Sequence, residues 1–148
     1  MSNATSEIKS PKICNHTSVG IILTNPQGQI LLIDRKRFPL FFACPAGHLE
    51  ENEQPEAGAI REAKEEVGFD VFNLQLVLHK RFDNPCRRQD GTYHEWWVYR
   101  ADFSGELLAS PDETKGVGWY DPLGVKKLQE AGKFEPVWQQ IFQELRII

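Results

Sequence analysis

The pattern of apolar and polar positions predicts an early pair of β-strands. Residues 17–24 (TSVGIILT) are mostly apolar or β-branched, which is typical of a buried strand. Turn residues follow at 25–28 (NPQG), and residues 29–34 (QILLID) form a second apolar run. We therefore expect the two runs to pair as a β-hairpin.

The rest of the chain is predicted to alternate between strands, loops and helices. The predicted loop at 83–92 is rich in turn residues, and the predicted loop at 105–118 is long. The strands and helices predicted around them are residues 71–82 (strand), 93–103 (strand), 119–120 (short strand), 123–130 (helix) and 134–148 (helix).

One stretch between these strands has the sequence of a loop followed by a helix. Pro55 fits the first turn of a helix, where its missing N–H costs nothing, and Gly68 fits a left-handed C-terminal cap. Helical periodicity predicts one apolar side and one acidic side. The apolar side comprises Ala57, Ile60, Ala63 and Val67, and the acidic side comprises Glu62, Glu65 and Glu66.

The acidic side of this helix predicts a cation site. Glu62 is three residues from Glu65 and four from Glu66, so the three carboxylates are neighbours that repel one another. Arg61 can pair with Glu65 at the i, i+4 spacing, but one guanidinium does not neutralise three acids. A bound Mg²⁺ would, because it takes oxygen ligands and commonly joins carboxylates to substrate phosphates. A solvated helix face is the alternative interpretation.

The spacing of these residues resembles the Nudix box, most closely over the 23 residues from Gly47 to Phe69. The motif positions present are Gly47, Glu53, Arg61, Glu62, Ala63, Glu65, Glu66, Gly68 and Phe69. Two positions depart from the usual pattern. Ala63 is small for its place. Ala46 stands where the family usually has glycine, so the sequence does not decide the conformation of the loop at this residue.

The resemblance implies an α/β protein with the Nudix fold, in which a mixed β-sheet lies between helices and the box forms a loop–helix motif. The length fits a single Nudix hydrolase domain over residues 1–148. We expect residues 1–14 to form a flexible N-terminal segment. Within it, Ser2, Asn3 and Ala4 could be the remnant of an expression tag.

The activity implied by the resemblance is hydrolysis of a phosphoanhydride bond in a nucleoside diphosphate linked to a group X. Mg²⁺ is the expected cofactor, with Mn²⁺ as a substitute. The expected metal ligands are Glu62, Glu66, Glu65 and the backbone carbonyl of Ala46. A nucleoside triphosphate is the first candidate substrate and an ADP-ribose-like nucleotide sugar is the second.

Other site residues follow from the same resemblance. Arg61 is expected to position the carboxylates, and Glu53 to hold a metal ligand or a bound water. Glu113 lies six residues before Trp119, the spacing of a loop glutamate in MutT-type members, and is the candidate general base, with Glu65 as its rival. The candidate substrate-binding residues are Arg35, Arg37, His48 and Phe42.

Composition limits the partners. A net charge of −4 gives no basic face for general nucleic-acid binding. It does not exclude a nucleotide, because a metal can supply the positive charge, and the resemblance implies a small-molecule nucleotide as the partner. No apolar run is long enough for a membrane span. The three cysteines, with no pair at metal-ligand spacing, fit a reduced cytoplasmic protein. Cys86 with His79 or His94 makes only a weak metal-site candidate, and both histidines are interpreted as structural.

Two other functions remain open at this level. A non-catalytic Nudix-fold module would bind nucleotides for regulation, and degenerate box carboxylates would mark it, whereas here all are present. An RNA 5′-end pyrophosphohydrolase would use a local basic rim, which residues 35–37 and 87–88 could form. A homodimer is compatible with the family, but no sequence feature specifies an interface.

Overall fold

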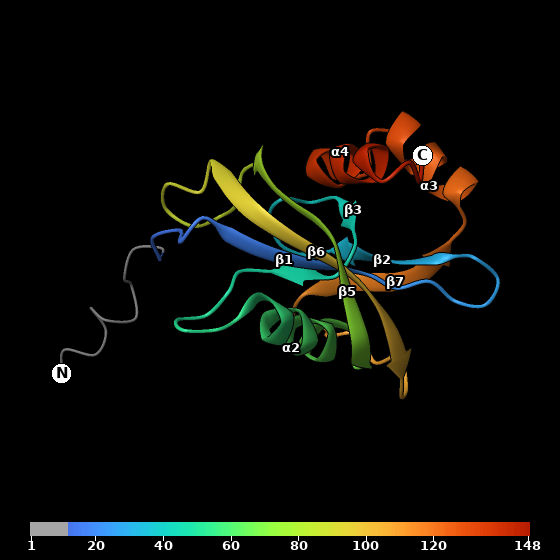
Figure 1. Cartoon of the computed structure of the whole chain (residues 1–148). Helices are drawn as coiled ribbons and strands as arrows, with labels where there is room; N and C mark the ends of the chain where they lie inside the picture. The colour runs from blue at the N-terminus through green and yellow to red at the C-terminus, as the bar shows by residue number, and fades with distance from the viewer. Residues whose placement is uncertain (1–11) are drawn as a thin grey trace.

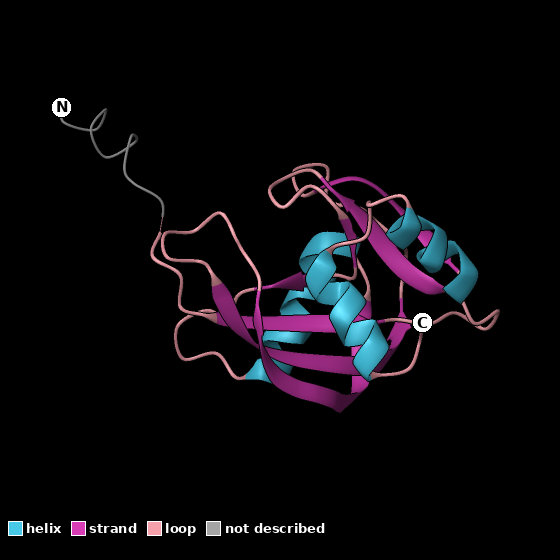
Figure 2. Cartoon of the chain, turned by 90° about the horizontal axis from the view of Figure 1, so that it is seen from above, coloured by secondary structure: helices cyan, strands magenta, loops and turns pink. Residues whose placement is uncertain are grey.

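The structure is a computed structural model that describes residues 12–148 (Figures 1 and 2). The predicted flexible segment and the tag remnant therefore lie almost entirely outside the described residues.

Two β-sheets lie between helices, which confirms the predicted fold class. The four-stranded sheet has the order β4-β1-β6-β5 and the three-stranded sheet has the order β3-β2-β7. In Figure 1 the helix α2 lies on one side of the strands, and α3 and α4 lie on the other. The bounds are β1 (Thr17–Ile22), β2 (Ile30–Arg35), β3 (Phe42–Ala43), β4 (Ala46–Gly47), α2 (Pro55–Val67), β5 (Asp70–Asp83), β6 (Tyr93–Ser104), β7 (Thr114–Tyr120), α3 (Pro122–Glu130) and α4 (Pro136–Glu144).

The predicted hairpin is confirmed at its turn, where Thr24 and Ile30 form an antiparallel bridge, and is wrong for the rest of the two strands. β1 pairs with β4 and, in parallel, with β6, whereas β2 pairs with β3 and β7 in the other sheet. Only the strand ends meet, where the N–H of Leu31 donates to the carbonyl of Leu23 at 3.0 Å. Both strands are almost wholly buried. Each therefore needs hydrogen-bond partners along both edges, and a hairpin would supply only one.

Two predicted boundaries also differ. β7 begins at Thr114 instead of residue 119, because it pairs with β2 along its whole length, from Ile30–Tyr120 to Arg35–Thr114. Glu113 is therefore the last residue of a shorter loop, 105–113, and lies directly before a strand. The last helix ends at Glu144, and Arg146 beyond it adopts a positive φ of 58°, which a helix cannot continue through.

The orientation of α2 differs from the prediction in a way that matters for the site. Ala63 and Val67 are buried as expected, but Ala57 and Ile60 face solvent. In their place Gly58 approaches the preceding loop so closely that a β-carbon there would lie 2.5 Å from the Leu49 side chain. This close approach turns the edge of the helix that carries Glu62 and Glu66 towards the protein interior.

Two apolar cores hold the helices to the sheets. One core includes Trp96 and Val98 of β6 and receives Trp138 and Phe142 of α4. The other core packs the small face of α2 against the opposite side of the strands; its buried members are Val19, Ile21, Leu23, Leu31, Ile33, Leu49, Ala59, Ala63, Val67, Phe69, Val71 and Tyr99. Packing against the strands therefore fixes the position of α2 and of the loop before it.

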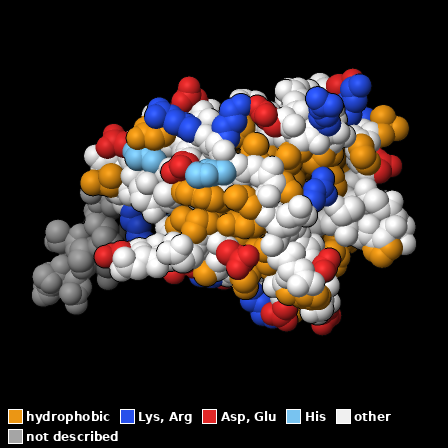
Figure 3. Space-filling view, in the orientation of Figure 1, with side chains coloured by type: hydrophobic (Ala, Val, Ile, Leu, Met, Phe, Trp, Pro, Cys, Tyr) orange, Lys and Arg blue, Asp and Glu red, His pale blue; other side chains and the backbone are white. Residues whose placement is uncertain are grey.

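The face shown in Figure 3 exposes apolar side chains near its centre. β5 forms one edge of the four-stranded sheet, and its Phe72 and Leu76 are among the exposed large hydrophobic residues.

No helix formed by residues 12–148 has the length and apolar character needed to cross a bilayer. The homodimer stays a prediction.

Candidate active site

A pocket of about 420 Å³ opens beside the loop that precedes α2 and the edge of α2 that carries Glu62 and Glu66. This volume lies in the range of small-molecule sites. The pocket is lined by both acidic and basic side chains. Its acidic lining residues are Glu62, Glu65, Glu66, Asp112, Glu113 and Glu135, and its arginines are Arg35, Arg87 and Arg88. A phosphate-bearing ligand with a cation would match this combination of charges.

Glu66 is the most buried acid of the box, with 5% of its surface exposed. Its carboxylate accepts a hydrogen bond of 2.9 Å from the backbone N–H of Ala46, which fixes it against the loop. Burial and the nearby charge of Glu62 raise the pKa of Glu66 well above its usual range. Neither Ala46 nor Gly47 has a positive φ, so alanine fits the usual glycine position without backbone strain.

Glu62 lies against Gly47, and glycine is required there by space and not by φ. A β-carbon at Gly47 would lie 2.2 Å from the carboxyl carbon of Glu62. Burial raises the pKa of Glu62 to about 7, although the neighbouring Arg61 guanidinium opposes the shift. The charges of Glu65 and Glu113 add to the increase. Glu62 and Glu66 are thus two crowded acids in one pocket.

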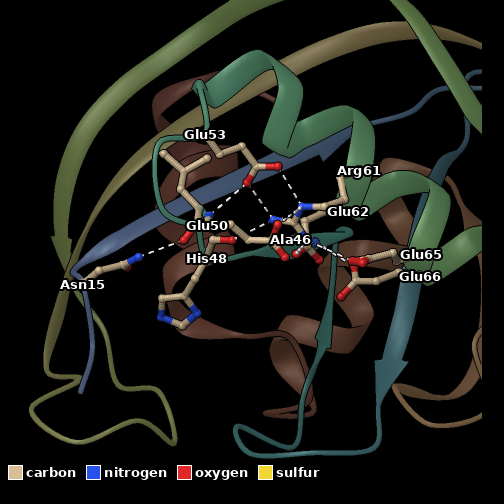
Figure 4. A network of polar contacts seen from close by, with 10 residues as sticks. Asn15, Ala46, His48, Glu50, Glu53, Arg61, Glu62, Glu65 and Glu66 are labelled. Carbon is tan, nitrogen blue, oxygen red and sulfur yellow. Dashed lines mark hydrogen bonds and ion pairs between the residues drawn. The ribbon is translucent and has the colours of Figure 1, made fainter. Parts of the chain in front are cut away.

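Arg61 organises the network drawn in Figure 4. It donates to both carboxylate oxygens of Glu53 at 2.8 Å, to Glu62 at 2.7 Å and to Glu65 at 2.9 Å. It also donates to the carbonyl oxygen of His48 at 3.0 Å, so it joins the helix to the loop. The predicted contact between Arg61 and Glu65 is therefore confirmed, and one planar guanidinium holds four groups.

Glu53 faces Arg61 and not the pocket. The hydrogen bonds from Arg61 lower the pKa of Glu53, and a further bond of 2.9 Å comes from the backbone N–H of Glu50. Glu53 therefore stays ionised as the anchor of Arg61. Its expected role as a support for the metal ligands agrees with this position but is not tested by it.

The donor set on the inner edge of α2 fits a hard divalent cation. Burial raises the pKa values of both Glu62 and Glu66, the charge of Glu62 raises that of Glu66 further, and a bound cation would offset both effects. Oxygen donors of this kind suit Mg²⁺ or Mn²⁺. The carboxylates of Glu62 and Glu65 contact Arg61 in this structure, so Arg61 competes with a cation for them.

The four predicted substrate-binding residues occupy different environments. Arg35 lines the pocket and donates to the carbonyl of Pro39 at 2.9 Å. Arg37 is outside the pocket lining and lies 3.7 Å from the carboxylate of Glu113. Phe42 packs edge-to-face on Tyr120 at the border of the core, so its position does not favour a contact with substrate. Phe38 from the same loop lines the pocket in its place.

His48 also lines the pocket, but its imidazole belongs to a second cluster. Figure 4 shows its carbonyl directed at Arg61 and its imidazole directed away from that network. Burial, reinforced by the charge of Arg88, lowers the pKa of His48 to about 3. Burial likewise lowers the pKa of His94 to about 4, so both imidazoles are neutral at pH 7.

Sequence reasoning missed Glu135. It precedes Pro136 at the start of α4, where an acid is so ordinary that no sequence signal distinguishes it. In the structure Glu135 is buried, lines the pocket, and has its pKa raised to about 7 by burial, with Arg35 opposing. Asn84 was missed for a similar reason, since turn sequences are rich in asparagine.

The family profile described as the NUDIX domain matches residues 15–138. The chain belongs to the Nudix family. Members of this family are hydrolases that generally use a divalent metal and act on small nucleotide substrates, and α2 with its preceding loop is the Nudix box of this chain.

Several characterised relatives are similar to this Nudix chain. It is 40% identical over 144 residues to an RNA pyrophosphohydrolase of Rhodospirillum rubrum, covering 86% of this chain and 84% of the relative. It is 30% identical over 101 residues to the NAD-capped RNA hydrolase NudC of Pseudomonas aeruginosa, covering 68% of this chain. That match spans only 34% of NudC, so the chain covers about a third of that relative.

Solved structures agree with this assignment. The MutT NUDIX hydrolase of Burkholderia pseudomallei is 28% identical, with a TM-score of 0.65 over 74% of this chain and 84% of that one. A NUDIX hydrolase of Nitrosomonas europaea has a TM-score of 0.70 over 93% of this chain and 89% of that one. At 16% identity, the second likeness concerns the fold alone.

Proposed function

We propose that this Nudix protein hydrolyses a phosphoanhydride bond of a nucleoside diphosphate derivative with the help of Mg²⁺. The observation that carries the proposal is the pair Glu62 and Glu66. Both acids line one pocket, both have raised pKa values, and Glu66 is fixed by the Ala46 N–H. Burying two crowded carboxylates is costly even though Arg61 pairs with Glu62, and a cation-dependent site gives both acids a use.

The residues present divide the work as follows. Glu62, Glu66, Glu65 and the Ala46 carbonyl would hold Mg²⁺ or Mn²⁺. The ion would polarise the phosphoryl group and neutralise charge that develops in the transition state. Arg61 positions the carboxylates through its four contacts, and Glu53 anchors Arg61. Arg35 and His48 line the pocket on the substrate side.

The proton from the attacking water requires a base. Glu113 lines the pocket, is about two-fifths exposed, and contributes to the raised pKa values of Glu62 and Glu66. It is therefore close enough to act on the same region, and its partial exposure keeps it accessible to water. Arg37 would hold its side chain in place through the ion pair. Glu65 is the rival base.

The leading substrate is a nucleoside triphosphate, followed by an ADP-ribose-like nucleotide sugar. One observation favours a second candidate, the triphosphate at the 5′ end of RNA. The relative from Rhodospirillum rubrum is named RNA pyrophosphohydrolase and aligns with most of this chain. Arg87 and Arg88 at the pocket add the positive charge that RNA phosphates need, although the net charge of −4 opposes general nucleic-acid binding.

The test is the release of phosphate, pyrophosphate or nucleoside monophosphate from a panel of substrates with Mg²⁺ or Mn²⁺. The panel contains nucleoside triphosphates, nucleotide sugars, NAD and a 5′-triphosphate RNA. Glu66→Gln is the active-site variant and Glu130→Gln, an exposed acid in α3, is the matched control. We expect Glu66→Gln to lose turnover by two orders of magnitude or more, on the order expected for an essential charged group.

The outcomes separate the candidates. Turnover of one class that is abolished by Glu66→Gln and kept by Glu130→Gln supports the proposal and names the substrate. Preference for RNA with a steep loss of affinity in salt favours the second candidate. Absence of turnover across the panel, with nucleotide binding retained, would show a binding module and refute the hydrolase.

A further inference from the structure

Four soft metal ligands meet at the edge of the pocket, outside the Nudix glutamates. Cys14, His48, Cys86 and His94 each place one ligand atom within 4.8 Å of every other. They come from four separate segments: the stretch before β1, the Nudix loop, the β5–β6 loop and β6. We propose that these four residues bind a structural Zn²⁺ ion.

The three distances from Cys14 Sγ to the other ligand atoms match the edges of a tetrahedron around zinc. Zn–S bonds of about 2.3 Å and Zn–N bonds of about 2.0–2.1 Å give tetrahedral edges of about 3.8 Å between sulfurs and about 3.5 Å between sulfur and nitrogen. The Sγ atoms of Cys14 and Cys86 are 3.8 Å apart. Cys14 Sγ lies 3.5 Å from Nε2 of His48 and 3.3 Å from Nε2 of His94.

A neighbouring amide orients one of the two histidines for metal binding. Asn84 Oδ1 accepts from the indole N–H of Trp96 at 3.2 Å and lies 3.0 Å from His94 Nδ1. Since an amide oxygen can only accept, Nδ1 of His94 carries the proton and Nε2 presents its lone pair to Cys14. An oriented second-shell partner of this kind accompanies metal-binding histidines.

The two sulfurs are supported in the same way. Cys14 Sγ accepts from the backbone N–H of His16 at 3.2 Å, and Cys86 Sγ accepts from that of Arg88 at 3.4 Å. Backbone N–H groups in these positions can donate to the sulfurs of metal-bound cysteines. Among the residues described, the third cysteine, Cys44, is buried in the core and is not part of this cluster.

The donor set selects zinc over the cation expected at the glutamates. Thiolate and imidazole ligands suit Zn²⁺, whereas Mg²⁺ prefers oxygen. Four protein ligands leave no open position, which is typical of a structural ion. Such an ion would tie the Nudix loop at His48 to the β5–β6 loop at Cys86, which carries Arg87 and Arg88 into the pocket.

The test measures metal in the full chain, purified under reducing conditions with no metal-affinity step. We expect about one zinc per chain by mass spectrometry, as a closed four-ligand site requires. Cys86→Ser should lose this zinc, and Cys44→Ala should keep it. His79→Ala is the matched control for His94→Ala, because His79 is exposed and stacks on Trp97 away from the cluster. Circular dichroism checks that each variant folds.

A second measurement does not depend on any variant. Co²⁺ added to metal-free wild-type protein should give intense visible bands and thiolate-to-cobalt charge transfer, which oxygen ligands cannot produce. No zinc and no charge-transfer band in the reduced protein would overturn the proposal. A disulfide between Cys14 and Cys86 in place of the thiols, or equal zinc loss in Cys44→Ala, would also overturn it. Neither readout requires hydrolase activity, so these results stand apart from the Glu66→Gln experiment.

Discussion

Gly47 and Glu62 touch so closely that no side chain fits between them, since a β-carbon on Gly47 would lie 2.2 Å from the Glu62 carboxyl carbon. The backbone φ at Gly47 is ordinary, so the contact alone accounts for glycine. The atoms that would clash belong to the end of a flexible side chain. An alanine at position 47 would therefore move the Glu62 carboxylate without unfolding the loop.

We predict that Gly47→Ala folds normally, with a change in unfolding free energy of less than about 1 kcal/mol. It should lose activity by tenfold or more and require more Mg²⁺ for half-maximal rate, because Glu62 is displaced. Gly116→Ala is the control, since a β-carbon at Gly116 meets nothing within 4 Å. Metal titrations of the hydrolysis rate check the prediction. Wild-type metal dependence in Gly47→Ala would contradict it.

Arg61 is expected to be irreplaceable by lysine. Lysine keeps the charge but cannot hold Glu53, Glu62, Glu65 and the His48 carbonyl together. We predict that Arg61→Lys lowers the free energy of unfolding by on the order of 2 kcal/mol and weakens Mg²⁺ activation. Urea denaturation measures the first effect. Arg146→Lys, at an exposed arginine, should change neither quantity.

Glu113 is predicted to be the general base. Glu113→Gln should reduce kcat by roughly 10²- to 10⁴-fold while leaving the fold intact. Asp112→Asn removes a neighbouring pocket acid and is the control for loss of charge alone. Near wild-type turnover in Glu113→Gln would shift the role to Glu65. The pH profile of kcat adds a check, since loss of the base should remove the acid limb.

Glu135 makes stability depend on pH. Its pKa is raised to about 7 in the folded protein, above the ordinary value of 4.5, so the folded state holds an extra proton between these values. Below pH 4.5 its burial adds no charge penalty, and above pH 7 the full penalty applies. Glu135→Gln should therefore be more stable than wild type by roughly 2–3 kcal/mol at pH 8 and equal to it near pH 4.5.

Urea denaturation of both proteins at pH 4.5 and pH 8 tests this difference. The neutral histidines of the pocket destabilise both proteins equally on acidification, so they cancel in the comparison. Glu130→Gln, at an exposed acid, should show no pH-dependent gain. A Glu135→Gln advantage that is the same at both pH values would contradict the prediction.

The sequence by itself determined the Nudix box, the helix that carries it and the order of most strands. These features depend on local spacing: Pro55 and Gly68 bound the helix, and the periodicity of apolar positions identifies the strands. The contact of Arg61 with Glu65 follows from one helical turn. Such relationships are fixed within a few residues, so they can be found without knowing the fold.

Only the tertiary structure decided which strands pair and which way α2 faces. β1 and β2 are adjacent in sequence but enter different sheets, because each pairs along one edge with a strand far along the chain, β6 for β1 and β7 for β2. The rotation of α2 follows from its close approach at Gly58, which periodicity cannot register. The sequence alone predicts that Phe42 contacts the substrate, whereas in the fold Phe42 packs on Tyr120.

The cluster of Cys14, His48, Cys86 and His94 shows the same division most clearly. No two of these residues have metal-ligand spacing in the sequence, and the nearest pair is eight residues apart. Parallel pairing of β1 with β6 and the contact of Cys14 N–H with the Gln89 carbonyl bring them together. Long-range strand pairing, and not local sequence, therefore determines whether this chain holds a second metal site.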